Sequence, residues 1–275
     1  MTIGGREFAW GSRTYVMGIV NVTPDSFSGD GLAHDQNAAI HKALQMREDG
    51  ADIIDVGGES TRPGFAEVAT EEESRRVLPV IERLARELDI PVSVDTYKAT
   101  VAKSAIDAGA TLVNDVHGFL REPEVAGVAA DAGVPAVAMY YHRGRPFIDT
   151  IGNIVAGLQE TFAAAREQGL AYERIIIDPG FNFGWKDEQA LEMLRRLGEL
   201  RVLGRPILIG TSRKSTIGNV LGLPVEERLE GTAATIAISI ANGADIVRVH
   251  DVKEMARVAR MTDAIVRPKE AVDAA

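Results

Sequence analysis

The sequence contains no cysteine. This absence excludes disulfide bonds, a thiolate nucleophile and thiolate zinc sites, and it is compatible with a reducing cytosol. Long apolar runs are absent too. The most apolar stretch, Ala233–Ala241, is interrupted by Thr235 and Ser239, and no run approaches the roughly 18 residues that a membrane-spanning helix needs. The first six residues lack the apolar core of a signal peptide, so we expect a cytoplasmic protein with no membrane partner.

An excess of basic residues is also missing. The chain has 30 Lys and Arg residues against 40 Asp and Glu residues, which gives a formal net charge of −10. Nucleic acids and anionic membranes bind basic surfaces, so we expect no nucleic acid partner. A small anionic substrate held by a few local cations remains compatible with this charge. With 45% hydrophobic and 25% charged residues, the 275-residue chain has the composition of a soluble globular protein with a sizeable core.

Short apolar runs recur along the chain, each followed by a longer segment with helical periodicity. The eight runs are Tyr15–Val20, Asp52–Val56, Pro91–Val94, Thr111–Val113, Val134–Met139, Arg174–Ile177, Pro206–Ile209 and Asp245–Val249. They are nearly continuous rather than alternating, as expected of parallel strands that are covered on both faces. One run occurs about every 34 residues, the size of one strand–helix repeat.

Helix signals fill the intervals between these runs. The predicted helices are Asp35–Asp49, Thr70–Leu88, Tyr97–Ala108, Asn153–Gln168, Asp187–Leu203, Glu226–Ala241 and Val252–Val266. Thr70-Glu71-Glu72-Glu73 has the form of a capping box, and Pro79 predicts a kink in the helix that follows. Eight strand–helix alternations predict an α/β fold, a (β/α)₈ TIM barrel, with residues 1–275 as a single domain.

Two further features bear on this fold. The segments Glu7–Trp10 and Arg13–Val16, on either side of Gly11-Ser12, predict an N-terminal β-hairpin. The alternative fold is a doubly wound sheet, which would normally carry a glycine-rich phosphate fingerprint after its first strand. Residues 20–24 read Val-Asn-Val-Thr-Pro and form no such fingerprint, which favours the barrel.

Polar residues follow seven of the eight predicted strands. They are Asn21; Asp55, with Glu59 and Thr61 beyond it; Asp95; Asn114 and Asp115; Asp178; Ser212, Arg213 and Lys214; and Arg248 and His250. A single Asp or Asn after a strand is usually the N-cap of the next helix. Caps do not require Lys, Arg and His, however, and the active sites of TIM barrels lie at the carboxyl ends of the strands. The pattern therefore predicts an active site there.

The chemistry of this set indicates its ligand. Carboxylates and a carboxamide, Asp95, Asn114 and Asp178, can bind the amino and lactam edges of a flat heterocycle. Lys214, Arg248 and His250 suit phosphate or carboxylate oxygens. The amide of Asn21 suits a hard cation such as Mg²⁺, which takes few protein ligands and binds substrate phosphates. Residues 210–215 lack the Gly-Lys-[Ser/Thr] spacing of a phosphate loop, so an NTPase is not expected.

In this order and across roughly residues 13–266, the motifs resemble those of the dihydropteroate synthase family. The matching segments are Met17–Ser28, Asp52–Gly64, Ser93–Lys98, Val113–Val116, Asp178–Phe181, Ser212–Ser215, Gly231–Ala233 and Val247–Val252. Such enzymes are (β/α)₈ barrels and usually homodimers. They join 6-hydroxymethyl-7,8-dihydropterin diphosphate to 4-aminobenzoate, and they release diphosphate and 7,8-dihydropteroate for folate synthesis.

The resemblance also implies roles for individual residues. Asp95, Asn114, Asp178 and Lys214 would hold the pterin, with Met139 lining its pocket, and Asn21 would be the Mg²⁺ ligand. Arg248 and His250 would contact the diphosphate. Thr61, Arg62 and Pro63 would lie on one loop and Asp25–Ser28 on another, while Phe27, Pro63, Phe181 and Ser212 would frame the aminobenzoate. We expect Asp95, Asp178 and Lys214 to be catalytic, with the carboxylates stabilising a cation at the pterin methylene, so that the neutral amine attacks without a side-chain nucleophile.

The sequence departs from the family pattern in two places. Many members carry a Met-His pair after the fifth strand, where this chain reads Met139-Tyr140-Tyr141-His142, and Asn182 and Trp185 vary a common Gly-Phe-Gly-Lys pattern. Two alternatives stay open: a catalytically silent pterin-binding paralogue, and a pterin-dependent methyltransferase of the corrinoid-linked type. The second should lack the Ser-Thr-Arg-Pro loop and the Ser-Arg-Lys-Ser motif, which are both present here.

Several residues of reactive types have ordinary structural explanations. We interpret His34, His41 and His117 as surface or packing residues. Asp55 and Glu59 are expected to be structural. Glu71–Glu73 is interpreted as an acidic helix N-terminus rather than a metal site.

Overall fold

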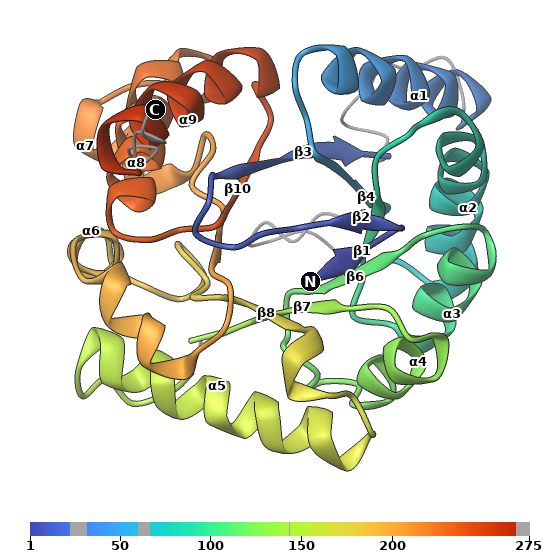
Figure 1. Ribbon diagram of the computed structural model, residues 1–275, viewed down its shortest axis with the longest axis horizontal. Helices are drawn as coiled ribbons and strands as arrows, with labels where there is room; N and C mark the ends of the chain where they lie inside the picture. The colour runs from blue at the N-terminus through green and yellow to red at the C-terminus, as the bar shows by residue number, and fades with distance from the viewer. Residues whose placement is uncertain (23–31, 60–66, 143, 268–275) are drawn as a thin grey trace, which may run out of the picture.

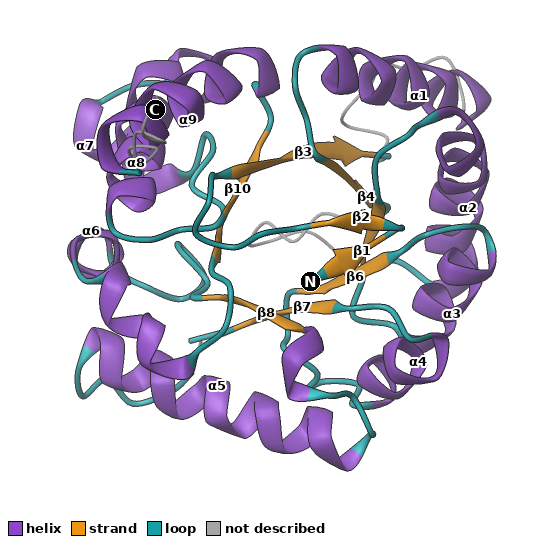
Figure 2. Ribbon diagram, in the orientation of Figure 1, coloured by secondary structure: helices purple, strands orange, loops and turns teal. Residues whose placement is uncertain are grey.

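The computed structural model describes residues 1–22, 32–59, 67–142 and 144–267. In this part of the chain, eight parallel strands form a barrel surrounded by helices (Figure 1; Figure 2). The strands are β3 (Tyr15–Asn21), β4 (Ile53–Gly57), β5 (Val92–Asp95), β6 (Leu112–Asp115), β7 (Ala136–Met139), β8 (Ile175–Asp178), β9 (Leu208–Ile209) and β10 (Ile246–Val249). The sheet runs from β8 through β7, β6, β5, β4, β3 and β10 to β9. A parallel bridge between Ile177 and Ile207 joins β8 to β9 and closes the barrel.

Helices connect successive strands on the outside of the barrel (Figure 2). They are α1 (Leu32–Glu48), α2 (Thr70–Glu87), α3 (Ala99–Asp107), α4 (Glu124–Ala132), α5 (Thr150–Glu167), α6 (Asp187–Arg195), α7 (Ser215–Leu221), α8 (Leu229–Ala241) and α9 (Val252–Val266). Short 3₁₀ turns occupy Tyr172–Arg174, Leu197–Leu203 and Val225–Glu227. Among the described residues, no helix is both long and apolar enough to cross a membrane.

The apolar residues form two principal cores because successive strand residues point to opposite faces. One core fills the space between the outer faces of the strands and the helices. The other lies inside the barrel toward the amino ends of the strands, where every strand except β5 contributes at least one residue. These inward residues are Tyr15, Met17, Ile53, Leu112, Val137, Ile176, Leu208 and Ile246. The barrel interior at this end is therefore packed with side chains rather than open.

An N-terminal hairpin covers this end of the barrel. Strands β1 (Thr2–Ile3) and β2 (Arg6–Glu7) pair in antiparallel fashion, and the buried side chains of Ile3 and Phe8 belong to the interior core. In Figure 1 the hairpin lies over the centre of the barrel. The predicted hairpin therefore exists, but its position was wrong. The turn is at Gly4-Gly5, where both glycines have the positive φ that a tight two-residue turn requires.

Other differences concern helix ends. Helix α2 begins at Thr70, but Ala69 is its N-cap and makes no side-chain capping bond, so the predicted capping box does not form. Instead, the Glu73 carboxylate binds Lys98. The predicted helix 187–203 is an α-helix only to Arg195 and then continues as a 3₁₀ turn. Helices α4 and α7 were not predicted.

Candidate functional site

Polar side chains occupy the upper half of the barrel interior. Each lies two residues beyond an inward-facing residue of the same strand, and the two-residue period of a strand therefore points it into the barrel. Asp55 follows Ile53, Asn114 follows Leu112, Asp178 follows Ile176 and Arg248 follows Ile246, and all four preceding residues belong to the interior core. The sequence thus places the apolar residues of the interior core (the apolar floor) toward the amino ends of the strands. The polar side chains above them form what we call the polar chamber, at the carboxyl ends of the strands.

The guanidinium of Arg248 joins two carboxylates across this chamber. Its Nε donates to Asp55 Oδ2 at 2.6 Å, and its Nη2 donates to Asp95 Oδ2 at 2.5 Å. The same Asp55 oxygen accepts from Asn114 Nδ2 at 2.9 Å. Asp55 is fully buried. Its bonds to Arg248 and Asn114 explain why a charged residue occupies an interior strand position. Asp55 is structural, as expected from the sequence, but it lies among the predicted site residues rather than beside them.

Burial sets the protonation of the groups in this chamber. Desolvation raises the pKa of Asp95 to about 7, although Arg248 opposes the shift. Desolvation also raises the pKa of Asp178, against the effect of Lys214, and it lowers the pKa of Lys214 to about 8. Burial alone would lower the pKa of Arg248, but Asp55 and Asp95 outweigh it and raise that pKa. Arg248 therefore stays charged, while Asp95 titrates near neutral pH.

Asp178 and Lys214 extend the site over β8 and β9. Asp178 is buried, and its Oδ1 accepts from the backbone N–H of Gly180 at 2.8 Å. The Lys214 ammonium donates to the carbonyl oxygen of Phe181 at 2.5 Å. Met139 lies opposite Asp178 in the register of β7 and β8 and is buried as well. The residues expected to hold a pterin thus lie at one end of the barrel, on the adjacent strands β5 to β8 and, for Lys214, between β9 and α7.

The two phenylalanines after β8 differ in exposure. Phe181 is fully buried in the outer core and meets Lys214 through its backbone carbonyl. Phe183 is partly exposed, and the Lys214 ammonium lies 4.6 Å from the centre of its ring. A ring that is fully enclosed has no free face for a ligand, so Phe183 is the better candidate to contact an aromatic substrate. Phe183 is not among the site residues predicted from the sequence. The positive φ of Asn182, which sets the turn between the two rings, was not evident from the sequence.

Ser212 and His250 form a pair at the ends of β9 and β10. The Ser212 hydroxyl accepts from the backbone N–H of His250 at 3.1 Å and lies 3.0 Å from the Nδ1 of that residue. In the tautomer in which the Ser212 hydroxyl donates its proton to Nδ1, Nε2 carries the proton of the neutral ring and can donate it. Burial, followed by the nearby Lys42, Arg248 and Arg213 cations, lowers the pKa of His250 to about 3. His250 can therefore donate a hydrogen bond to an anion without carrying a charge.

Asn21 ends β3 and is partly exposed, in register with Gly57 of β4. In the described ranges, no three His, Cys, Asp or Glu side chains are grouped closely enough to hold a metal ion. A protein cage for a cation is thus not formed there. The amide oxygen of Asn21 fits a Mg²⁺ ion that takes its other ligands from water and substrate phosphates.

Some of the predicted site residues lie outside the described residues. They are Phe27, within the predicted Asp25–Ser28 loop, and Thr61, Arg62 and Pro63. Both segments follow the strands that end at Asn21 and Gly57.

The departure at residues 139–142 forms an aromatic contact between two loops. Tyr140 is buried, its hydroxyl lies 3.0 Å from His142 Nδ1, and the His142 ring stacks on Trp185 with centres 3.9 Å apart. A Cβ on Gly157 would lie 2.1 Å from the Tyr140 ring, so that glycine makes room for the tyrosine. Tyr140, His142 and Trp185 therefore join the loops after β7 and β8, whereas the side chain of Asn182 binds Ser215 and Thr216 of α7.

His117, interpreted from the sequence as a surface or packing residue, packs between two aromatic residues. Its ring centre lies 5.0 Å from that of Tyr97 and 5.0 Å from that of Tyr141. Burial lowers its pKa. This lowered pKa favours the neutral form of the ring between Tyr97 and Tyr141.

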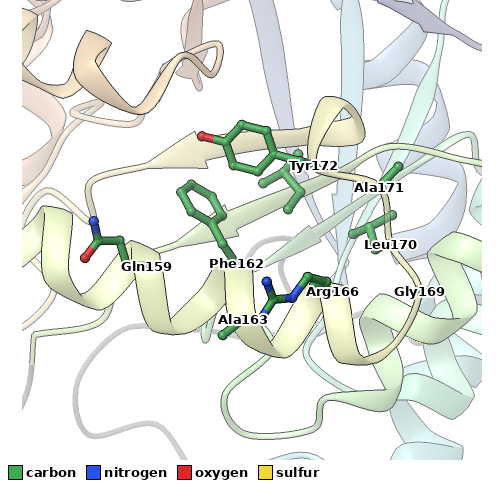
Figure 3. Close-up of a pocket in the computed structure, with 9 residues that line it drawn as sticks. Gln159, Phe162, Ala163, Arg166, Gly169, Leu170, Ala171 and Tyr172 are labelled. Atoms are coloured by element: carbon green, nitrogen blue, oxygen red, sulfur yellow. The ribbon is translucent and has the colours of Figure 1, made fainter.

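A separate pocket of about 600 Å³ lies on the outside of the barrel, between α5 and the chain that leads into β8 (Figure 3). Phe162 and Tyr172 form part of its lining, with ring centres 4.9 Å apart. Its β8 residue is Ile175, at the opposite end of the strand from Asp178. This pocket is thus distinct from the polar chamber.

Comparison with known proteins decides the family. Residues 17–250 match the model of the pterin binding enzyme family. The dihydropteroate synthase of Clostridium beijerinckii is 51% identical over 268 residues, which cover 97% of this chain and 100% of the relative. The chain belongs to the dihydropteroate synthase family. This family is the one that the sequence motifs resemble, and its barrel fold agrees with the barrel described above.

Solved structures of synthases have the same fold. A Clostridium difficile dihydropteroate synthase, crystallised in the presence of pteroic acid, superposes with a TM-score of 0.92 at 50% identity and covers 95% of this chain and 100% of its own. The Xanthomonas albilineans dihydropteroate synthase in complex with 7,8-dihydropteroate has a TM-score of 0.85 at 40% identity, with coverages of 92% and 94%.

Proposed function

We propose that this chain catalyses the synthase reaction, in which 6-hydroxymethyl-7,8-dihydropterin diphosphate and 4-aminobenzoate give 7,8-dihydropteroate and diphosphate. The observation that carries the proposal is the buried Asp55–Arg248–Asp95 bridge, with Asn114, Asp178 and Lys214 beside it. A chamber of this kind offers both donors and acceptors to a flat heterocycle and a cation to its diphosphate.

In the proposed complex, Asp95, Asn114 and Asp178 bind the edges of the pterin. A buried carboxylate can accept from ring N–H and amino groups, and those bonds favour its charged form. Substrate binding is therefore expected to lower the pKa of Asp95 from about 7. Arg248 is the one described cation that already bridges this carboxylate, so it fixes Asp95 in place while the pterin binds.

The diphosphate is proposed to bind on the side of β9, β10 and β3. Arg248 and Lys214 supply positive charge, and His250 donates from Nε2 to a phosphate oxygen. Arg62, expected from the sequence, would add a further cation. Asn21 would hold Mg²⁺ together with the diphosphate, and the ion supplies charge neutralisation for the leaving group.

The chemical step then needs no protein nucleophile. The C–O bond to the diphosphate breaks, and positive charge delocalises from the exocyclic methylene into the dihydropterin ring. The buried carboxylates of Asp95 and Asp178 stabilise that charge because they act in a low-dielectric chamber. The neutral amine of 4-aminobenzoate forms the new C–N bond and loses its proton to solvent. This is an alkyl transfer.

We also propose that the synthase is a homodimer and acts in the cytoplasm. Helices α8 and α9 lie side by side (Figure 1). They expose large apolar side chains, namely Ile238, Met261 and Ile265, which are 50%, 64% and 66% exposed. A second copy of the chain would cover such a surface. Light scattering should give twice the monomer mass, and Met261→Asp should shift the protein toward monomer. A monomeric wild-type protein at micromolar concentration would contradict the dimer.

The function is tested by incubating the protein with the pterin diphosphate, 4-aminobenzoate and Mg²⁺ and measuring diphosphate release. Release should depend on the amine and decrease when EDTA removes the metal. Pterin binding without amine-dependent release would favour the silent paralogue and contradict the proposed reaction.

A further inference from the structure

Asn182 lies between the two phenylalanines that follow β8, in a backbone conformation that few residues adopt. Its φ is 71°, in the left-handed region. Asparagine enters this region more readily than most residues with a side chain, but glycine adopts it without strain. The common family pattern has glycine where this chain has Asn182. Strained residues of this kind cluster at functional sites, and the side-chain contacts of Asn182 are consistent with such a role.

The amide of Asn182 contacts the first turn of α7. Its Nδ2 donates to Ser215 Oγ at 2.5 Å, and its Oδ1 contacts the hydroxyl of Thr216. Thr216 is 1% exposed, and its hydroxyl also lies 2.6 Å from Oδ1 of Asp187, the first residue of α6. The hydroxyl of Thr216 thus links Asn182 to both helices, and Asn182 is anchored where α6 and α7 meet.

The residues on either side of Asn182 contact Lys214, the residue before α7. The Lys214 ammonium donates to the carbonyl oxygen of Phe181 at 2.5 Å, and it lies 4.6 Å from the centre of the Phe183 ring. Lys214 and Asn182 therefore both join segment 181–183 to segment 214–216. If the Lys214 ammonium turns toward a substrate, its bond to Phe181 is weakened, whereas the bonds of Asn182 remain. Asn182 can thus keep the two segments aligned while Lys214 binds a ligand.

The backbone of Phe183 is also held on its other side. Its N–H donates to the carbonyl oxygen of Gly180 at 2.9 Å, and its own carbonyl oxygen accepts from the N–H of His142 at 3.2 Å. These bonds fix Phe183 relative to the loops after β7 and β8, and the amide of Asn182 fixes the preceding residue relative to α7. Contacts with three elements therefore determine the position of Phe183.

We propose that Asn182 is a positioning residue of the synthase, which holds the Phe183 ring at a fixed distance from the Lys214 ammonium so that the ring of the amine substrate can lie against Phe183. Among the described residues, the hydrogen-bond partners of Asn182 include none of the three residues proposed to bind the pterin edges. The inference rests on the proposed synthase function and on Phe183 as a contact of 4-aminobenzoate.

The first test compares Asn182→Gly with Asn182→Asp. Glycine relieves the strain of the positive φ while it removes the amide bonds, so Asn182→Gly should leave the midpoint of urea unfolding nearly unchanged. Its KM for 4-aminobenzoate should rise about fivefold or more, because misplaced binding groups weaken productive binding. The Kd for the pterin diphosphate, measured by titration calorimetry, should change less than about twofold. Asn182→Asp keeps an acceptor for the hydroxyls of Ser215 and Thr216 and should recover part of the loss.

Asn242→Gly is the matched control. Asn242 lies between α8 and β10, toward the amino ends of the strands, and its Nδ2 donates to the carbonyl oxygen of Leu194 at 2.7 Å. The control loses the same kind of side-chain bond away from the chamber, so its KM for the amine should match the wild type.

A double substitution tests whether Asn182 acts through Phe183. In a Phe183→Leu background, Asn182→Gly should raise the KM for the amine by less than about twofold more, because the ring that it positions is gone. Hydrogen exchange tests the anchor without activity: the amide of Phe183 should exchange about tenfold faster in Asn182→Gly and at the wild-type rate in Asn242→Gly. If Asn182→Gly does not fold, Ser215→Ala removes one partner of the amide and should raise the KM about threefold.

Three results would overturn the inference. One is an unchanged KM for the amine in Asn182→Gly. Another is an equal rise in that KM and in the Kd for the pterin, with a lower urea midpoint, which would show a general structural role. The third is a KM that rises as much in the Phe183→Leu background as in the wild type.

Failure of the proposed function gives a different result. A wild-type protein without amine-dependent diphosphate release would refute the synthase reaction and, with it, the role of Asn182 in amine binding. Exchange at Phe183 decides the anchor in either case, and an unchanged rate in Asn182→Gly would refute the contact on which the inference depends.

Discussion

Removal of the Arg248 guanidinium should destabilise the fold as well as abolish substrate binding. Arg248→Met leaves Asp55, which is fully buried, and Asp95, which has a side chain 9% exposed, without their shared cation. Breaking a buried ion pair by removing one partner costs about 3–5 kcal/mol, because the remaining charge is uncompensated. We expect the free energy of unfolding, measured in urea, to fall by about this amount.

Matched variants make this expectation specific. Arg47→Met removes a cation that pairs with Asp89 on the surface, where the two side chains are 38% and 61% exposed, and it should cost no more than about 1 kcal/mol. Adding Asp55→Asn to Arg248→Met removes one of the two buried carboxylates that have lost their cation, and it should recover part of the lost unfolding free energy. Two results would refute the assignment of Asp55, Arg248 and Asp95 as a buried, coupled unit. One is an Arg248→Met variant that is as stable as Arg47→Met. The other is a double variant in which the effects of the two substitutions are simply additive.

Three further predictions follow from the same structure. Lys214→Ala should abolish turnover while circular dichroism and thermal unfolding remain near wild type, and normal turnover would show that the end of β9 is wrongly assigned. The pKa of Asp95 is raised from 3.8 to about 7, so the folded state favours the protonated form, and the wild type loses stability as the pH rises through this range. Asp95→Asn cannot titrate, so its unfolding free energy relative to that of the wild type should increase between those pH values and level off above them. A difference that does not change with pH would contradict the raised pKa. Gly157→Ala should lower the free energy of unfolding by about 1–3 kcal/mol, because its Cβ would overlap the Tyr140 ring. In a Tyr140→Ala background the same substitution should have no such effect. An equal loss of stability in both backgrounds would point to a different cause.

The barrel could be predicted because its strands are buried on both faces. All eight predicted strands appear within one or two residues of their predicted positions, since an uninterrupted apolar run is a strong local signal. The hairpin was misplaced because two glycine-containing turns compete near the N-terminus. Gly4-Gly5 forms the turn because Ile3 and Phe8 on either side of it pack into the barrel, and that packing is a tertiary contact that the local pattern does not contain.

The site could be predicted only in part, for a similar reason. The order of strands brings Asp95, Asn114, Asp178, Lys214 and Arg248 to one end of the barrel. Which group contacts which is decided by side-chain reach: Arg248 spans the chamber to Asp55 and Asp95, and Glu73 binds Lys98 instead of capping its own helix. Such long-range pairs leave no periodic signal in the sequence.

The apolar floor of the barrel has a kinetic consequence. Because Ile3, Phe8 and the inward residues of the strands close one end, molecules can enter and leave the chamber only through the other. Whatever binds deepest must arrive first and depart last. A pterin that reaches Asp95 and Asn114 at the bottom of the chamber would be trapped beneath the amine, so the two substrates should add in a compulsory order, and diphosphate should leave before the joined product. Initial-rate patterns with the amine as varied substrate would then intersect rather than run parallel.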